Sequence, residues 1–169
     1  MLFNYLIGLY LQSNFFKMIQ DILLTFLISI SPFGEARVGI PYGVESTTLP
    51  LYIIFIVGLV ANLLVFPLFY KSIEFSNKFF LKNLYYKKIA IYLSARAKTK
   101  TKSMIQKYGV IGLMIFVMIP LPVTGAYIGT IAAYIFRIDY KKSLIAISTG
   151  ITISSTIVIF GWPLITSLF

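Results

Sequence analysis

A charged, proline- and glycine-rich stretch at residues 31–43 lies between two long apolar runs and limits the structures that this chain can form. It contains Glu35 and Arg37 with two prolines and three glycines, whereas the runs at 22–30 and 51–60 carry no charge. Proline ends or kinks a helix because its ring removes a donor and crowds the preceding turn. Ionisable residues at membrane depth are costly and by default indicate a functional site. We therefore expect Glu35 and Arg37 in a hydrophobic environment, each the other's nearest candidate partner.

The composition is that of an integral membrane protein. Hydrophobic residues make up 59% of the chain and charged residues 12%, with a mean hydropathy of +0.89, well outside the range of soluble domains. Cysteine and histidine are absent, so disulfides, thiolate or imidazole metal sites and the usual nucleophilic triads lack their side chains. Glu35 is the only carboxylate expected at depth, which leaves no acid–base pair. We expect one membrane domain over residues 1–169, no enzyme activity and no cofactor or metal.

Ten of the fifteen basic residues fall within residues 71–107, where Glu74 is the only acid. The positive-inside rule and the attraction of anionic headgroups favour a cytoplasmic location for this basic loop. Its apolar residues recur at intervals of seven, four and seven: Ile73, Phe80, Leu84 and Ile91. This spacing predicts an amphipathic helix on the leaflet, and the polar segment 94–102 predicts a flexible turn. We expect membrane lipids as partners and no nucleic acid, because no recognition motif accompanies the block.

The first half of the chain predicts a surface helix, a hairpin and a span. Residues 1–17 are apolar but short for a crossing, which takes about 20 residues, so we expect an N-terminal interfacial or partly inserted helix. Residues 18–31 predict a helical limb that is too short to span, with Asp21 near its start where the helix dipole favours an acid. A second short limb follows the break and ends at the polar residues 45–48. Residues 49–70 predict an uncharged full span.

The second half repeats this order. Residues 108–136 resemble one long span, but the prolines and glycine at 119–125 forbid a regular helix and divide it into two short limbs. Three basic residues between 137 and 142 follow at once, which places both ends of this hairpin on the side of the basic loop. Residues 143–169 predict the last span, running outward.

A hairpin followed by a span in each half, with opposite orientation, indicates an inverted-topology repeat. The repeats are 18–70 and 108–169, joined by the basic loop at 71–107. We expect an all-α integral membrane protein, multi-pass in the cell membrane, in which two re-entrant helical hairpins face each other at the bilayer midplane. Formation of a homodimer is compatible with this fold. Broken helices at matching places in the two halves point to the binding site of a transporter.

The chemistry of the first break favours anions and protons. Arg37 keeps its charge and offers a planar fork of donors, and Glu35 can gain or lose a proton. The two side chains would then form an anion-binding group beside a proton-coupling carboxylate. Alternatively, they pair with each other or cap broken helix ends and hold the hairpin together. We favour the functional interpretation because an uncharged break would cost less desolvation.

The second break offers backbone donors and a hydroxyl. Half-helix N-termini carry unsatisfied N–H groups and partial positive charge, which suits a phosphate or carboxylate. Tight packing through Gly125 and its small neighbours is the structural alternative, and both can hold. We expect Glu35 and Arg37 to lie near Pro122, Thr124 and Gly125. The candidate substrate- and proton-binding residues are Glu35, Arg37, Pro41, Pro120, Pro122, Thr124 and Gly125.

The two break motifs together resemble those of the small multidrug export protein family. The first family motif looks like Glu-x-Arg-Gly-Ala-Ile-Pro and the second like Pro-Leu-Pro-Gly-Thr-Gly-Ala-Trp-x-Gly. The matching residues are Glu35, Arg37, Ile40, Pro41 and Gly43 in the first, and Pro120, Leu121, Pro122, Thr124, Gly125, Ala126 and Gly129 in the second. The chain departs from these motifs at 38–39, at Val123 in place of a glycine, and at Tyr127 in place of the tryptophan. The resemblance covers residues 20–160.

That family is distantly similar to the DedA, or VTT, membrane proteins, whose facing re-entrant hairpins carry acidic and arginine residues and whose proposed roles are in moving lipid phosphates. The resemblance implies a transporter, although the arginines of the second DedA hairpin are missing here. We predict a small secondary transporter, proton-coupled through Glu35, that moves an anionic amphiphile or lipid phosphate in the manner of a flippase or scramblase. The alternatives are an exporter of small hydrophobic cations and a non-transporting membrane scaffold or assembly factor.

Overall fold

The computed structural model describes residues 2–80, 83–120 and 125–166, and over these ranges the chain is helical without strands. The helices are α1 (Leu2–Ile30), α2 (Glu35–Ser46), α3 (Leu51–Phe80), α4 (Leu84–Met118), α5 (Ala126–Ile135) and α6 (Tyr140–Thr166). Three apolar stretches are long enough to cross a membrane, namely Gln12–Ile30, Leu51–Phe79 and Tyr140–Leu164. The predicted all-α membrane class is confirmed.

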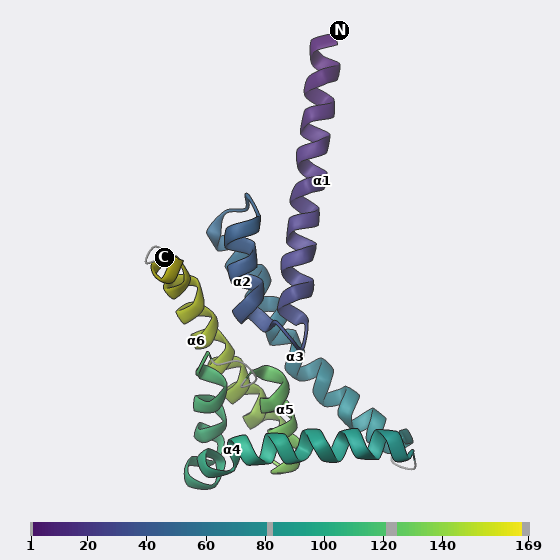
Figure 1. The fold of residues 1–169 in the computed structure, drawn as a ribbon, viewed down its shortest axis with the longest axis vertical. Coiled ribbons are helices and arrows are strands. Elements are labelled where there is room, and N and C mark those ends of the chain that lie inside the picture. The colour runs from purple at the N-terminus through teal and green to yellow at the C-terminus, as the bar shows by residue number, and fades with distance from the viewer. Residues whose placement is uncertain (1, 81–82, 121–124, 167–169) are drawn as a thin grey trace.

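The first break lies where the sequence predicts it, at Pro32 and Gly34. α1 ends before the break, and α2 returns alongside α1 (Figure 1). The Ser31 hydroxyl donates to the Ile28 carbonyl at 2.9 Å and accepts from the Gly34 N–H at 3.1 Å, which stabilises the turn. Glu35 then adopts a φ of +53°, an uncommon left-handed conformation for a residue with a Cβ. The chain therefore reverses direction within a few residues.

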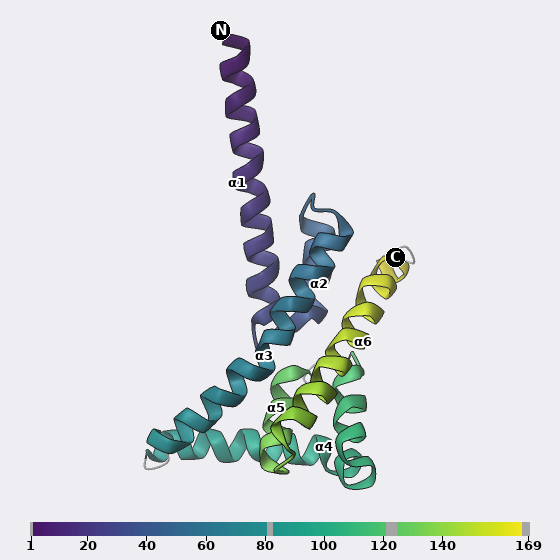
Figure 2. The same ribbon diagram turned by 180° about the vertical axis from the view of Figure 1, so that it is seen from behind.

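The second break separates α4 from α5, so residues 108–136 do not form one helix. α4 itself changes direction at Gly109, whose φ of +58° and ψ of −128° are accessible almost only to glycine. The N-terminal part of α4 runs across one end of the molecule, and its last turns rise beside α5 (Figures 1 and 2). This second bend, which the sequence did not reveal, brings the end of α4 toward the first break.

The core forms where α3, α5, α6 and the last turns of α4 pack together. Its largest fully buried side chains are Phe66, Leu113, Ile147, Ile151, Val65 and Val117. α6 approaches α4 closely at Gly150, where a Cβ would lie 2.8 Å from the Met114 carbonyl oxygen. A smaller cluster of Ala36, Ile40, Ile54 and Ile159 joins α2 to α3 and α6. These contacts hold the first break against the second half of the chain.

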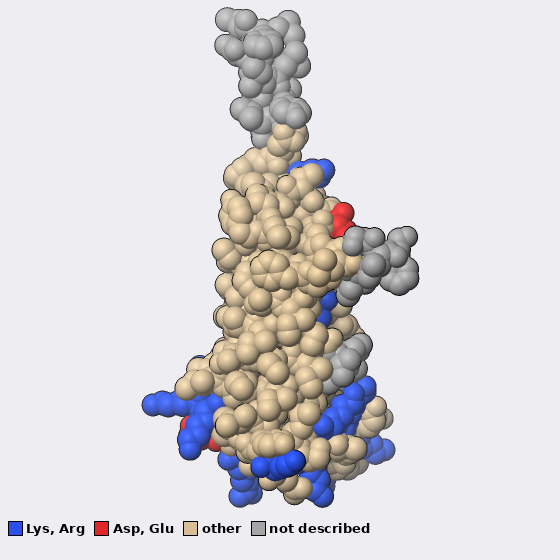
Figure 3. Space-filling view, turned by 90° about the vertical axis from the view of Figure 1, so that its left-hand side faces the viewer, with Lys and Arg blue, Asp and Glu red and all other residues tan. Residues whose placement is uncertain are grey.

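Charge is distributed unevenly over the surface. Lys and Arg side chains gather mainly at the end crossed by α4, and most of the visible face above them is uncharged (Figure 3). Apolar side chains of the spans, such as Leu27, Ile56 and Phe160, are more than half exposed. A chain with this surface is suited to a bilayer, where lipid covers exposed apolar side chains.

Residues 2–17, the described part of the predicted N-terminal helix at 1–17, do not form a helix of their own, because α1 is continuous over Leu2–Ile30. Its scattered polar side chains do not end the helix, and no proline precedes Pro32 to break it. Asp21 therefore lies inside α1 and not near its start, and it is only 8% exposed. The prediction that this limb is too short to span is wrong, because its apolar stretch Gln12–Ile30 has 19 residues and is long enough to cross a membrane.

The basic loop at 71–107 is also more helical than predicted. α3 continues to Phe80, and residues 94–102 are helical within α4 and form no flexible turn. The apolar repeat that we assigned to one amphipathic helix is divided between α3 and α4. Alanine and lysine favour helices, and Ala97, Thr101 and Ile105 are buried at four-residue steps. This face of α4 packs inward. The many lysines of the segment favoured an exposed turn in the sequence analysis, so the buried face was not predicted.

Candidate functional site

The two breaks meet at a cavity of about 610 Å³. Four of the predicted site residues line it: Glu35, Arg37, Pro120 and Gly125. Pro41 lies outside this lining and is buried inside α2. Pro122 and Thr124 lie outside the described residues. The fold thus brings the described site residues of both breaks to the same cavity.

The Glu35 carboxylate lies at the N-terminus of α5. Its Oε1 accepts a hydrogen bond from the Tyr127 N–H at 3.4 Å, and the side chain is 7% exposed. A Cβ at Gly125 would overlap the carboxylate, so glycine is required for this approach. A carboxylate at a helix N-terminus is stabilised by the free N–H groups and by the helix dipole. Glu35 therefore caps α5, which has no side-chain cap of its own.

The Arg37 side chain lies at the C-terminal end of α4, on the other side of the second break from α5. Its Nη2 donates to the carbonyl oxygen of Val117 at 2.9 Å, within the last turn of α4. Carbonyls in the last turn of a helix lack partners within the helix, and the dipole favours a cation there. The two charged residues of the first break thus bind the two helix ends at the second break. Glu35 accepts a hydrogen bond at the start of α5, and Arg37 donates one at the end of α4.

Tyr127 is a site residue that sequence reasoning missed. Its hydroxyl donates to the carbonyl of Ile30 at the end of α1, and its ring packs edge-on against Phe69 with centroids 4.9 Å apart. The side chain lines the cavity next to Glu35. The one signal in the sequence was its place in the second family motif, where it replaces a tryptophan. Tyr127 connects the start of α5 back to the first break.

Arg96 was also missed, because it falls in the segment predicted as a turn. It lines the cavity from α4 and is exposed. Phe33, at the tip of the first break, is 98% exposed and lines the same cavity. The remaining walls are mainly apolar and include Phe69 and Ile128. The cavity therefore combines two guanidinium groups, one carboxylate that caps a helix, and an apolar surface.

No three His, Cys, Asp or Glu side chains in the described ranges are grouped so that they could hold a metal ion. The chemistry that these residues offer is the recognition of charge and of apolar surface. A guanidinium binds phosphate or carboxylate through two parallel hydrogen bonds.

Comparison with known protein families gives a match over most of the chain. The model of a family described as small multi-drug export protein matches residues 35–157. The matched segment begins at Glu35 and contains α2 to α5 and much of α6, including the second break. Neither a curated protein nor a solved structure matches the chain.

Proposed function

The chain belongs to the small multi-drug export protein family, and from this premise we propose that it is a small secondary membrane transporter for an anionic amphiphile such as a lipid phosphate. The observation that carries the proposal is the position of Arg37 and Arg96 on one cavity whose other walls are largely apolar. Guanidinium groups suit a phosphate, and apolar walls suit acyl chains. An amphiphile presents both surfaces at once.

The proposed topology is an inverted repeat of two helical hairpins, each broken at a proline- and glycine-containing turn, and the first hairpin has one limb, Gln12–Ile30, that is long enough to cross a membrane. In each half a pair of helices around a break precedes a long apolar helix, α3 in the first half and α6 in the second. The pairs α1–α2 and α4–α5 approach the cavity from opposite ends of the molecule (Figure 1). The basic end is proposed to face the cytoplasm, as the positive-inside rule favours. Irregular backbone at membrane depth is tolerated where it lines such a cavity.

Glu35 is proposed to couple transport to protons. Its carboxylate caps α5, and protonation would remove the negative charge that favours this position at the helix end. The contact between the two halves would then weaken while Arg37 keeps its charge for an anion. Proton binding and movement of α5 are thereby linked through one side chain.

Export of small hydrophobic cations is the second candidate, favoured by the family description. It would require Glu35 as the counter-ion of the substrate. The Glu35 carboxylate already accepts from α5 and shares the cavity with Arg37 and Arg96, which disfavours a cation. A membrane scaffold that docks through its basic surface is the third candidate.

Flux into proteoliposomes tests these candidates. Phosphatidic acid labelled on its acyl chain serves as the anionic amphiphile and tetraphenylphosphonium as the hydrophobic cation. Wild-type protein should move the labelled lipid, and Arg37→Ala should slow it by about tenfold through loss of a charge-assisted contact. Lys141→Ala is the matched control, since Lys141 is exposed and lies outside the cavity lining.

Each outcome assigns one candidate. An unaltered lipid flux in Arg37→Ala would refute the anion proposal. Movement of the cation alone would support drug export. If neither probe moves, and neutralising the loop lysines abolishes cellular function while Glu35→Gln preserves it, the scaffold is supported.

A further inference from the structure

A second cavity of about 180 Å³ lies between the N-terminal part of α4 and the helices α3 and α5. Its polar lining consists of hydroxyl and amide groups: Ser72, Ser76, Asn77, Tyr86, Ser94 and Tyr134. No charged side chain belongs to this lining in the described part of the chain. We call it the outer cavity and the one between the breaks the deep cavity.

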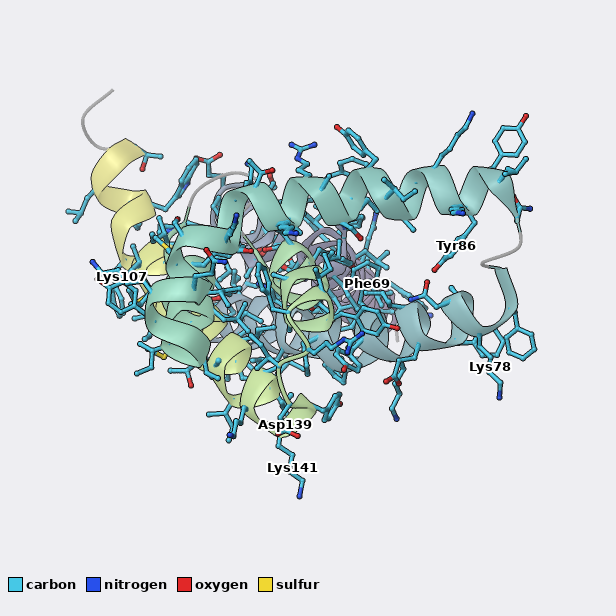
Figure 4. All side chains as sticks on the ribbon, turned by 90° about the horizontal axis from the view of Figure 1, so that it is seen from below. Phe69, Lys78, Tyr86, Lys107, Asp139 and Lys141 are labelled. Carbon is cyan, nitrogen blue, oxygen red and sulfur yellow. The ribbon has the colours of Figure 1, made fainter. Side chains whose placement is uncertain are left out.

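The outer and deep cavities share three apolar lining residues. These are Phe69 of α3, Leu93 of α4 and Ile131 of α5. Because each comes from a different helix, their side chains form a partition whose width depends on how the three helices pack. Seen from the basic end, Phe69 lies between α3 and α5, nearer the centre of the molecule than Tyr86 (Figure 4).

The partition is coupled to the first break through Phe69. The Phe69 ring packs edge-on against Tyr127 at an interplanar angle of 64°. The hydroxyl of Tyr127 is hydrogen-bonded to the Ile30 carbonyl at the end of α1. A change at the deep cavity that moves Tyr127 would therefore break the ring contact that holds Phe69 in position.

A chain of hydrogen bonds crosses the outer cavity. The Tyr86 hydroxyl donates to Asn77 Oδ1 at 2.7 Å, and Asn77 Nδ2 donates to the Tyr134 hydroxyl at 3.0 Å. These three residues belong to α4, α3 and α5, the same helices that supply the partition. In Figure 4 the Tyr86 side chain points from α4 toward α3. Competition by a polar ligand for these bonds would loosen α4 from its neighbours.

We propose that the outer cavity is the access compartment through which a substrate headgroup passes between the basic end and the deep cavity, and that Phe69, Leu93 and Ile131 form the gate between them. The inference rests on the proposed transport function of the deep cavity. Hydroxyl and amide groups can replace the water around a headgroup without holding it by charge, so the headgroup can move on to Arg37. An apolar constriction closes such a path by excluding water.

Single introduced cysteines can test the gate, because the chain has none of its own. Ser76→Cys places a thiol in the lining of the outer cavity. Ile128→Cys places one in the lining of the deep cavity, at a position where the native side chain is 8% exposed. Membrane fragments open on both faces are treated with a charged thiol reagent that does not enter lipid. We expect Ser76→Cys to react quickly and Ile128→Cys slowly.

Removing the gate side chain should expose the deep cysteine. Phe69→Ala should raise the labelling rate of Ile128→Cys by about tenfold, as loss of one partly buried aromatic contact would allow, and leave that of Ser76→Cys nearly unchanged. Phe69→Leu should give a smaller rise in the same direction and keeps an apolar side chain in place. Phe75→Ala is the matched control, since Phe75 is on α3, is 62% exposed and lines neither cavity.

Two results would overturn the gate. One is that Ile128→Cys is labelled at the same rate whether Phe69 is intact, changed by Phe69→Leu or changed by Phe69→Ala. The other is fast labelling of Ile128→Cys with Phe69 intact. Labelling does not require transport. If labelling does not depend on Phe69, the gate proposal fails but the result of the flux assay is unaffected. If labelling depends on Phe69 but no lipid flux is found, only the proposed substrate is refuted.

Discussion

The Oε1 of Glu35 accepts a hydrogen bond at 3.4 Å from the backbone N–H of Tyr127, 92 residues further along the chain. The relationship is reciprocal, because the Tyr127 hydroxyl donates to Ile30 at the end of α1, 97 residues away. Each half of the chain thus supplies a polar group to a broken helix end of the other. Such ends leave N–H and C=O groups without partners, which is costly where water is excluded. The cavity between the two breaks lies at this pair of contacts.

Gly125→Ala should destabilise the protein, because the new methyl group would overlap the Glu35 carboxylate. Overpacking of this kind costs about 1–3 kcal/mol. Thermal unfolding in detergent should show a lowered midpoint. Adding Glu35→Ala to Gly125→Ala should recover part of the loss, since the obstructing group is removed. Additive losses in this double-mutant cycle would contradict the contact.

Glu35→Gln should uncouple lipid flux from an imposed proton gradient. The glutamine keeps the shape and one acceptor oxygen for Tyr127 but cannot be ionised. Wild-type flux in proteoliposomes should change when a proton gradient is imposed, and variant flux should not. Glu45→Gln, at the far end of α2 and hydrogen-bonded to Trp162, is the control and should behave as wild type. A Glu35→Gln protein that still responds to the gradient would exclude Glu35 as the coupling group.

Tyr127→Phe should lower stability by about 1 kcal/mol, the net value of one hydrogen bond. The phenyl ring still packs against Phe69, while the Ile30 carbonyl loses its donor. The midpoint of thermal unfolding measures the loss. Tyr92→Phe, whose side chain is 62% exposed on α4, is the matched control and should have little effect. Equal midpoints for the two variants would show that the bond across the halves contributes nothing.

Gly109→Ala should be destabilising although no atom beyond the adjoining backbone lies within 4 Å of the added methyl group. The cause is the backbone, since a residue with a Cβ at φ +58° and ψ −128° carries strain of about 1–3 kcal/mol. Gly161→Ala is the matched control, because Gly161 is also open but lies within α6. There alanine should be neutral or stabilising by about 0.5–1 kcal/mol. Similar unfolding midpoints for the two variants would argue against the bend at Gly109.

Sequence reasoning located both interruptions of the helices but not every helix end. Proline and glycine act on the local backbone, so the breaks at Pro32 and Pro120 could be predicted. The bend at Gly109 could not, because a lone glycine inside an apolar run is also found in straight helices. The lysine-rich segment 94–102 was expected as a turn, and it is helical because its alanines and lysines favour helix and Ala97 packs inward.

For the candidate site, the sequence by itself determined which residues were available: an acid and a base at one break, and exposed backbone groups at the other. Only the tertiary structure decided which helix ends they bind. Glu35 caps α5 and Arg37 binds the Val117 carbonyl, 80 residues away, while the two opposite charges also attract each other, as the sequence indicated. The physical reason is that a broken helix end must be satisfied by whatever polar group the fold brings within reach, and no local pattern specifies a partner at that separation.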